Sequence, residues 1–230
     1  MISETKKAKY IECFVDKLKF KNSSEKTIAC YKNVVKHYLD WCPDDPYRIS
    51  SDQIVKYMLS GNYASRTQAQ IRGTLMNFYT WVIGQPDKFQ KVPYPKRETK
   101  IPNVLSKEKI ANGMKQIKNI KHLCIVKLLY GCGMRVGDVL NMKPSWIRRH
   151  EGVILIKQGK GKKDRMVMLD QKLLGDLEQY YREYNPIEFM FNGQFSNRYS
   201  AKSIQSITEK YFKTNPHTLR HSFATHLMEV

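Results

Sequence analysis

The sequence has few acidic residues and no long apolar run. Its 230 residues contain 21 Asp and Glu against 40 Lys and Arg, which gives a formal net charge of +19 at pH 7. No stretch reaches the roughly 18 apolar residues of a membrane-spanning helix, and the start of the chain lacks the apolar segment of a signal peptide. From these absences we expect a cytoplasmic protein with no membrane partner.

Cysteine is scarce, and its pattern excludes two common uses of the residue. The cysteines are odd in number and no two are spaced as Cys-x-x-Cys: Cys13, Cys30, Cys42, Cys124 and Cys132. Neither a disulfide framework nor a zinc ribbon is therefore predicted. Their apolar neighbours favour reduced and mostly buried thiols.

The excess of positive charge is spread along the chain. Residues 1–103 carry 18 basic and 10 acidic side chains, and residues 104–230 carry 22 and 11. This distribution excludes a basic tail on a neutral body. With 41% hydrophobic residues the chain can also build packed cores. The composition therefore predicts folded domains that bind a polyanion such as nucleic acid.

The first 85 residues are predicted to form a helical domain. Apolar residues recur at helical spacing in residues 4–20, 24–39, 51–59 and 65–84. Residues 86–103 break the pattern with four prolines and several basic side chains, and we predict a linker there. A basic linker suits a protein that wraps a DNA duplex, although an ordinary solvated linker would have a similar composition.

Residues 104–230 combine helices with one predicted hairpin. Strand-like runs at 153–156 and 166–169 flank a basic turn that contains glycine. Helical patterns surround the hairpin at residues 106 onward, 122–130, 135–142, 171–184, 201–212 and 218 onward. We expect an α+β domain with a small antiparallel sheet, in a chain that is mainly α-helical.

The run from His217 to His226, His-Thr-Leu-Arg-His-Ser-Phe-Ala-Thr-His, is the most informative motif. Asn215 is a suitable N-cap and Pro216 suits a first turn, so His217 and Arg220 are predicted at a helix N-terminus. Backbone N–H groups and the helix dipole favour an anion there. The imidazole can donate a proton to a phosphoryl oxygen, and the guanidinium can contact two oxygens.

A second candidate lies in the run Gly131-Cys-Gly-Met-Arg135-Val-Gly-Asp138. On a helical turn, the carboxylate of Asp138 can hold the guanidinium of Arg135, although a surface ion pair is the simpler interpretation of these two residues alone. The glycines allow the backbone to approach a ligand closely. In the predicted hairpin turn, Lys160 lies between two glycines, where it can reach a phosphate or remain a solvated turn residue.

Together these segments are more specific than each is alone. Their order is Gly-x-Arg-x-x-Asp, then Gly-Lys-Gly-x-Lys-x-Arg between two strands, then His-x-Leu-Arg-His-x-Phe-Ala-Thr-His. This order resembles the tyrosine recombinase (phage integrase) family, whose members include Cre, the Xer proteins and lambda integrase. The resemblance covers nearly the whole chain, including residues 199–207, which are similar to the family's helix leading up to the His-x-x-Arg segment.

The resemblance implies a domain organisation and a function. It implies a helical, SAM-like core-binding domain at 1–85, the linker at 86–103, and at 104–230 a catalytic domain of the DNA breaking-rejoining enzyme type that is incomplete at its C-terminus. The implied function is that of a site-specific DNA recombinase or integrase that clamps double-stranded DNA. In its complete form such an enzyme is a homo-oligomer, a tetramer on paired sites.

The resemblance also implies a role for each matching residue. Arg135 and Arg220 match the arginines that clamp the scissile phosphate and stabilise the transition state, and Asp138 matches the acidic position that supports the site. Lys160 matches the lysine that protonates the 5′ leaving oxygen, and His217 matches an acid/base group. No metal or other cofactor is implied, because cationic side chains supply the charge that Mg²⁺ supplies elsewhere.

Further basic residues are predicted to contact DNA. Lys162 and Lys163 are alternative candidates for the role of Lys160, and Arg165 follows in the same basic segment. In the first domain, Arg66 and Arg72 lie on predicted helices and are expected to contact the DNA backbone.

No nucleophile is assigned. In the family a further His or Trp and then the nucleophilic Tyr follow the His-x-x-Arg helix, whereas this sequence ends at Val230 and all its tyrosines precede His217. A 3′-phosphotyrosyl intermediate, which conserves bond energy for rejoining, is expected only in the complete form of the protein. We expect this chain to bind and polarise a DNA phosphate without attacking it.

Two alternatives remain open. His217, His221 and His226 could share a metal ion, because residues four apart lie on one helix face, but packing and polar-network roles explain His221 and His226 better. The chain could also be a non-catalytic DNA-binding protein on the recombinase scaffold. That alternative predicts salt-sensitive duplex binding with no covalent protein–DNA adduct.

Overall fold

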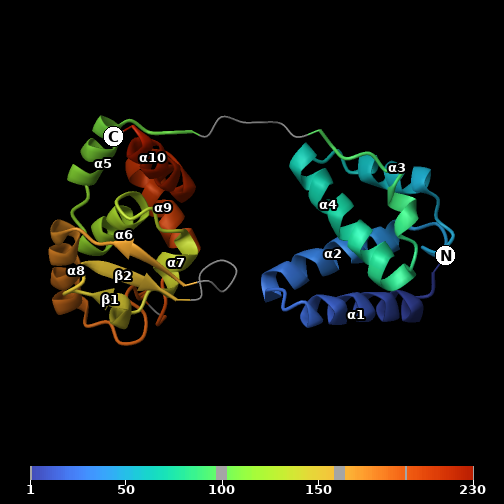
Figure 1. Cartoon of the computed structure of the whole chain (residues 1–230), viewed down its shortest axis with the longest axis horizontal. Coiled ribbons are helices and arrows are strands. Elements are labelled where there is room, and N and C mark those ends of the chain that lie inside the picture. Colours follow the sequence, from blue (N-terminus) through green and yellow to red (C-terminus); the bar gives the residue numbers. More distant parts are fainter. Residues whose placement is uncertain (1, 97–102, 158–163, 195, 230) are drawn as a thin grey trace. The chain divides into compact units, whose positions relative to one another are not determined.

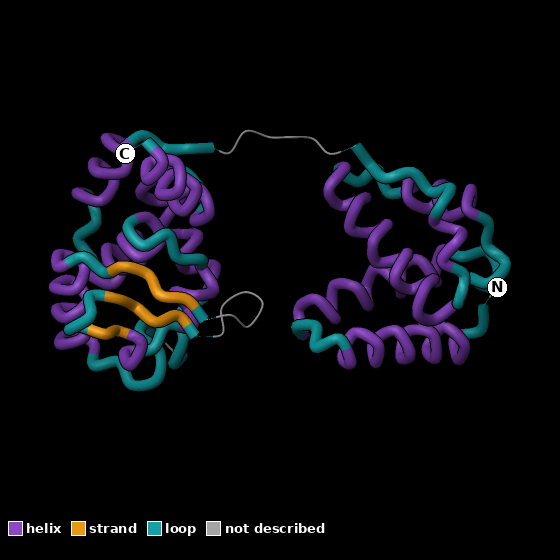
Figure 2. Tube along the Cα trace, in the orientation of Figure 1, coloured by secondary structure: helices purple, strands orange, loops and turns teal. Residues whose placement is uncertain are grey.

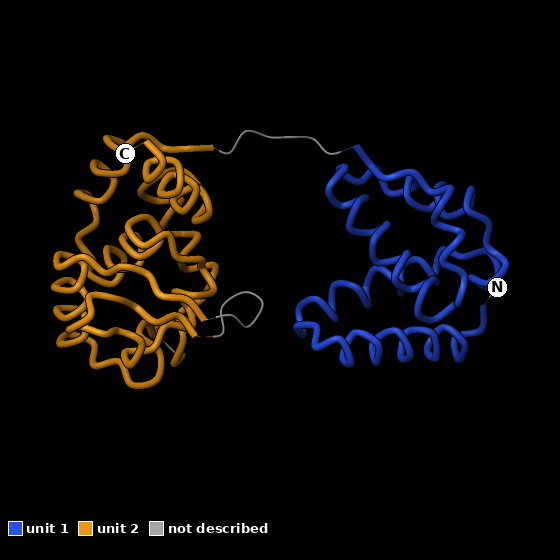
Figure 3. The backbone as a smooth tube through the Cα atoms, in the orientation of Figure 1, with its two compact units in different colours: residues 1–100 blue, residues 101–230 orange. Residues whose placement is uncertain are grey.

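The structure is a computed structural model that describes residues 2–96, 103–157, 164–194 and 196–229 (Figure 1). The chain divides into two units, Met1–Lys100 and Ile101–Val230 (Figure 3). Helices dominate both units, and the only strands in the described residues belong to unit 2 (Figure 2). The prediction of a mainly α-helical chain with a small antiparallel sheet is confirmed.

Unit 1 contains the four helices that the apolar spacing predicts. Its elements are α1 (Glu4–Phe20), α2 (Glu25–Trp41), α3 (Ser51–Ser60), α4 (Ser65–Phe78), the π-helical turn η1 (Tyr79–Ile83) and the 3₁₀ helix η2 (Pro86–Phe89). The side chains of Ser3, Ser24 and Ser50 cap the first three helices by accepting a backbone N–H of the first turn. Helix α4 begins without such a cap, because Ala64 occupies its N-cap position.

An aromatic core holds these helices together. Phe14 and Phe78 are fully buried and meet edge to face at 5.8 Å. The hydroxyl groups of Tyr38 and Tyr79 are buried and lie 2.6 Å apart, and the Tyr79 hydroxyl donates to the carbonyl oxygen of Pro46 at 3.1 Å. Tyr79 therefore joins the loop after α2 to the core through two hydrogen bonds, whereas the Tyr38 hydroxyl bonds Tyr79 and the nearby Cys42 thiol and does not contact the loop carbonyl.

This difference predicts unequal effects of removing the two hydroxyl groups. Tyr79→Phe removes both hydrogen bonds of the Tyr79 hydroxyl, to Tyr38 and to Pro46, and we expect a loss of about 1 to 2 kcal/mol in the free energy of unfolding. Tyr38→Phe leaves Tyr79 paired with Pro46 and should cost about half as much. Urea unfolding of the two variants checks the order, and equal losses would contradict it.

Residues 86–96 differ from the predicted extended linker. Phe89 and Val92 are only 3% and 2% exposed and belong to the core of unit 1. The guanidinium of Arg72 donates to the carbonyl oxygens of Phe89 at 3.2 Å and Val92 at 2.9 Å, and it lies 4.9 Å from the ring centre of Tyr94. The prolines here end regular helices, but the chain still packs on α4, so the linker assigned to 86–103 began too early.

Unit 2 places a three-stranded sheet among seven helices or helical turns of its described residues. Its elements are α5 (Lys107–Lys115), α6 (Ile120–Tyr130), α7 (Val136–Asn141), η3 (Pro144–Trp146), β1 (Ile147–Arg148), β2 (Val153–Ile156), β3 (Arg165–Met168), α8 (Gln171–Tyr184), α9 (Ala201–Phe212) and α10 (Pro216–Met228). The strands are antiparallel in the order β1-β2-β3, which confirms the predicted hairpin. The two-residue strand β1 was not predicted, because it is too short to show a pattern.

Helix α6 is the centre of unit 2. Its residues Cys124, Ile125, Val126, Leu128 and Leu129 are fully buried, and it contacts α7, α8, α9 and α10 (Figure 1). The buried Ser222 hydroxyl on α10 accepts the backbone N–H of Leu105 at 2.9 Å, which attaches the start of unit 2 to its last helix. Packing on α6 thus brings α7 and α10 together, although 80 residues separate Arg135 from Asn215 in the sequence.

The cysteines are free, as predicted, and three of the five are buried. Burial raises the pKa of Cys132 to about 12, and the Cys132 thiol donates to the carbonyl oxygen of Met168 at 3.3 Å. Cys13 and Cys30 are exposed, so the expectation of burial applies to the other three.

Candidate functional site

A tight connection between α6 and α7 forms the first part of the site. Gly133 has φ +56, a left-handed backbone conformation, and a Cβ atom there would lie 2.4 Å from Cδ1 of Phe223. Glycine is therefore required by both conformation and space. Arg135 follows as the N-cap residue of α7, and the carboxylate of Asp138 accepts its backbone N–H at 3.0 Å.

The partner of Asp138 differs from the predicted one. Its carboxylate forms an ion pair with the guanidinium of Arg165 on β3, rather than with the guanidinium of Arg135. The Asp138 side chain is only 7% exposed, and the ion pair and the Arg135 N–H bond use the same oxygen, Oδ2. Within the described residues, the Arg135 guanidinium has no hydrogen bond or ion pair of its own.

Sheet register explains how Arg165 reaches Asp138. Arg165 pairs with Ile156 and Val167 pairs with Ile154, and residues directly opposite in an antiparallel pair share a face. Both isoleucines are fully buried, so Arg165 points to the core side of the sheet. The sequence of β3 contains this information, because its alternation places Arg165 at an inward-facing position. An arginine at such a position needs an acidic partner.

Helix α10 supplies the third part of the site. Asn215 caps it by accepting the Thr218 N–H at 3.2 Å, and Pro216 occupies its first turn, as predicted. His217 is exposed in this first turn, whereas Arg220 is half-buried and donates from Nη1 to the carbonyl oxygen of Gly133. Arg220 thus lies beside the connection between α6 and α7.

The positive charges of three arginines, Arg135, Arg165 and Arg220, act on one another in this site. Burial lowers the pKa of the Arg220 guanidinium below its ordinary value, the positive charges of Arg135 and Arg165 lower it further, and Asp138 opposes this shift. The Arg220 guanidinium is therefore within reach of the charges of two other arginines and of one buried carboxylate. Such an excess of positive charge favours an anion that can accept several hydrogen bonds, such as a phosphate.

The other predicted site residues lie elsewhere or outside the described residues. Lys160, Lys162 and Lys163 are outside them, so their roles stay predictions. Arg66 is exposed on α4 with no hydrogen bond or ion pair to any described residue, whereas Arg72 is bound to backbone carbonyl groups.

The histidines of α10 do not form a metal site in the part of the chain that is described. There, no group of three His, Cys, Asp or Glu side chains is placed to hold a metal ion. His226 Nδ1 lies 3.0 Å from the Tyr130 hydroxyl, which confirms its predicted place in a polar network. His221 is exposed.

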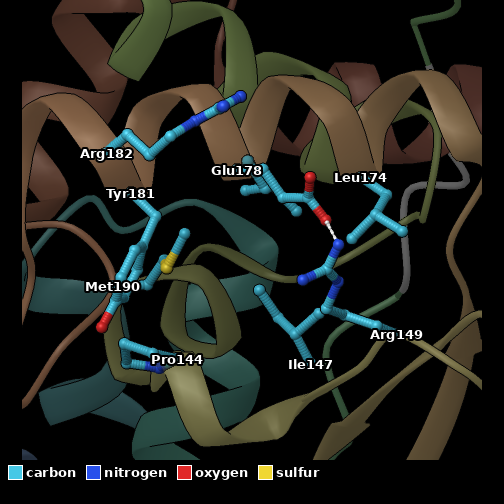
Figure 4. A pocket seen from close by; sticks show the side chains of 9 residues that line it. Pro144, Ile147, Arg149, Leu174, Glu178, Tyr181, Arg182 and Met190 are labelled. Carbon is cyan, nitrogen blue, oxygen red and sulfur yellow. Dashed lines mark ion pairs between the residues drawn. The ribbon is translucent and has the colours of Figure 1, made fainter.

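A groove of about 550 Å³ lies apart from these residues, between α8 and the η3–β1 segment (Figure 4). Arg149 and Glu178 form an ion pair at 2.6 Å across it. Leu174 and Met190 contribute apolar lining (Figure 4). None of the residues of the arginine site lines this groove.

His122, at the start of α6, gives unit 2 a predicted dependence on pH. Its Nε2 lies 3.4 Å from the Tyr199 hydroxyl, and its buried Nδ1 has no partner among the described residues. Burial, followed by the charges of Lys121 and Lys210, lowers its pKa. The unfolded chain, with a His pKa near 6.5, therefore binds this proton more readily than the folded chain.

The free energy of unfolding should accordingly fall as the pH drops below about 6.5 and level off below the lowered folded pKa. His122→Gln should flatten this part of the curve. His221→Gln, at an exposed position of the same unit, is the control. Urea unfolding of the wild type and both variants between pH 7.5 and 5 gives the comparison, and parallel wild-type and His122→Gln curves would contradict the prediction.

Comparisons with family models match both units. Residues 103–230 match the model of the phage integrase family, and residues 10–88 match the model of the phage integrase N-terminal SAM-like domain. The two matches leave residues 89–102 between them.

Curated relatives and solved structures give the same result. The chain is 32% identical to the putative integrase/recombinase y4qK of Sinorhizobium fredii over 60% of this chain and 47% of that protein, so it spans about half the length of this relative. It is 28% identical to the tyrosine recombinase XerA of Pyrococcus furiosus, over 100% of this chain and 83% of the relative. A structure of a lambda integrase tetramer bound to a Holliday junction has a TM-score of 0.77 at 17% identity, covering 96% of this chain and 70% of that one.

The family model alone spans more than half of the chain, over the unit that carries the arginine site. The fold of both units is shared with solved integrase structures. The chain belongs to the phage integrase family of tyrosine recombinases.

Proposed function

We propose that this chain binds duplex DNA and that the arginine site of unit 2 holds the scissile phosphate of a site-specific recombination reaction. The observation that carries the proposal is that the Arg220 guanidinium feels the charges of Arg135 and Arg165, while the nearby buried carboxylate of Asp138 is already paired with Arg165. This site has positive charge in excess before any ligand binds. A phosphodiester supplies the missing negative charge and accepts several N–H donors at once.

The proposed roles follow from position. Arg135 and Arg220 contact the phosphate and stabilise the charge that develops on it in the transition state. His217, exposed at the N-terminus of α10, is the proposed acid/base group. Lys160 is the proposed donor to the 5′ leaving oxygen. No tyrosine among residues 1–230 is proposed as the nucleophile.

Both units are proposed to contribute to DNA binding, because both carry an excess of basic residues. The family relationship supports assembly of several copies on paired DNA sites, since the similar lambda integrase structure is a tetramer bound to a Holliday junction. In the described part of the chain, no helix is both long and apolar enough to span a membrane. We propose that the protein acts on DNA in the cytoplasm.

Duplex binding at varied salt tests the proposal. We expect the affinity for a fluorescent 30-base-pair duplex of random sequence, measured by anisotropy, to fall steeply as salt increases, because each neutralised phosphate contributes about −0.9 to the slope of log K against log salt. The double variant Arg135→Met/Arg220→Met should bind at least about tenfold more weakly and lose about 1.8 from the magnitude of that slope.

The control is Arg148→Met/Arg182→Met, which removes the same charge from exposed positions of unit 2 that lie outside the arginine site. Circular dichroism confirms that each variant is folded. The proposal fails if the wild type does not bind the duplex, or if the site variant and the control bind equally well.

A further inference from the structure

The geometry points to a positioning role for Arg165: it holds Asp138, and through it Arg135, and does not itself contact the DNA phosphate. This inference refines the proposed function and rests on it for the identity of the ligand. It replaces the expectation that Arg165 is simply one of the basic residues that contact DNA.

One oxygen atom links the two arginines. Oδ2 of Asp138 accepts the Arg135 backbone N–H at 3.0 Å and the Nη2 donor of Arg165. The oxygen can serve the Arg135 N–H only if the carboxylate keeps its orientation. Arg165 comes from β3 and Asp138 from α7, so the ion pair attaches the hairpin strand to the first turn of the helix that begins after Arg135.

Burial makes this ion pair difficult to exchange. The Asp138 side chain is 7% exposed and that of Arg165 is 28% exposed. A buried carboxylate without a counter-charge is strongly unfavourable. The Nη2 donor of Arg165 is used by Asp138, and turning the guanidinium away to a phosphate would break this ion pair beside a second negative charge.

The other two arginines are in a different state. The Arg220 guanidinium donates to a neutral carbonyl group, that of Gly133, and the Arg135 guanidinium has no ion pair with any described residue. Neither guanidinium therefore has a direct ion pair with a carboxylate of the described residues, although Asp138 acts on Arg220 from nearby. The site thus contains one paired arginine, which sets geometry, and two arginines whose charge remains available to the ligand.

Amide hydrogen exchange of the DNA-free chain tests the link directly. We expect Arg165→Met to accelerate exchange of the Arg135 amide at least tenfold, because the Asp138 carboxylate loses its anchor, while the Val126 amide in α6 keeps its rate. Arg148→Met, which breaks an exposed ion pair with Glu151, is the matched control and should change neither rate. Arg165→Lys keeps the positive charge and should accelerate exchange of the Arg135 amide less than Arg165→Met does. It replaces Arg165→Met in this test if the methionine variant does not fold.

A double-mutant cycle then tests the consequence for DNA. With the same 30-base-pair duplex, Arg165→Met should weaken binding about tenfold in the wild-type background and less than twofold in the Asp138→Asn background, because the positioning path is already broken there. An Arg135 amide that exchanges at the wild-type rate in both the Met and Lys variants overturns the inference. So does an equal loss of affinity in both backgrounds, as expected of a direct phosphate ligand.

The two proposals can fail separately. Wild-type protein that does not bind the duplex refutes the proposed function, whereas the exchange rate of the Arg135 amide is measured without DNA and judges the role of Arg165 alone.

Discussion

Replacing Gly133 with alanine is expected to lower the free energy of unfolding of unit 2 by about 2 to 4 kcal/mol. The left-handed conformation at this position costs an L-residue about 1 to 2 kcal/mol. In addition, the new Cβ atom would lie 2.4 Å from the ring of Phe223, and relieving such an overlap typically costs about 1 to 3 kcal/mol.

The same substitution should also damage the arginine site. The Gly133 carbonyl oxygen accepts the Arg220 guanidinium, and Phe223 lies on the same helix as Arg220. A displaced Phe223 ring or a rotated Gly133 peptide would move Arg220 away from Arg135. We therefore expect weaker duplex binding even at temperatures where the variant is fully folded.

Gly137→Ala is the control for this prediction. Gly137 lies on α7, four residues from Gly133, and a Cβ atom there meets no atom within 4 Å. Alanine in a helix is favoured over glycine by about 0.5 to 1 kcal/mol, so this variant should be slightly more stable than the wild type. Urea unfolding, monitored through the amide signals of α6, measures the stability of both variants. Equal stability of the two variants would contradict the account of Gly133.

Replacing Arg72 with methionine is expected to destabilise unit 1 by about 2 to 3 kcal/mol without changing the salt dependence of DNA binding. The guanidinium donates to the Val92 carbonyl from both Nε and Nη2, at 3.1 and 2.9 Å, and to that of Phe89 at 3.2 Å. Hydrogen bonds from a charged donor contribute about 1.5 to 3 kcal/mol, and here they hold a segment whose apolar side chains complete the core.

Arg66→Met provides the contrast on the same helix. Arg66 is exposed and bound to no described residue, so its loss should change stability by less than about 0.5 kcal/mol. If Arg66 contacts the DNA backbone, its removal lowers the magnitude of the salt slope by about 0.9. Hydrogen exchange of the α4 amides and anisotropy at four salt concentrations separate the two arginines. An Arg72 variant of wild-type stability with a reduced slope would restore the original expectation that Arg72 contacts DNA.

The predictable part of the fold is the part that depends on neighbouring residues. Apolar spacing located the helices of both units, and polar residues such as Ser24 and Asn215 mark helix starts because their side chains accept a nearby N–H. The hairpin was predictable for the same reason, since two runs of β-branched and apolar residues flank a glycine-containing turn. Family resemblance then indicated which basic residues belong to one site.

The partners of charged side chains were not predictable in this way. The three-residue spacing predicts that Asp138 pairs with Arg135, yet its ion pair is with Arg165, 27 residues away, since β3 presents that side chain to the core. The sequence predicts that Arg72 contacts DNA. In the structure its guanidinium instead donates to the carbonyl groups of Phe89 and Val92, 17 and 20 residues later. A charge in a sequence shows that a partner is needed, and only the packing of the chain determines which one it finds.

The hydrogen bond between the Leu105 N–H and the Ser222 hydroxyl bears on how the chain folds while it is being synthesised. Its two residues are 117 positions apart, so it cannot form until Ser222 has left the ribosome. Helix α6 faces the same delay, because one of its main contacts is with α10. The described core residues of unit 1 all lie before residue 93, so this core can form first. The apolar surface of α6, by contrast, stays without α10 until the residues around Arg220 emerge.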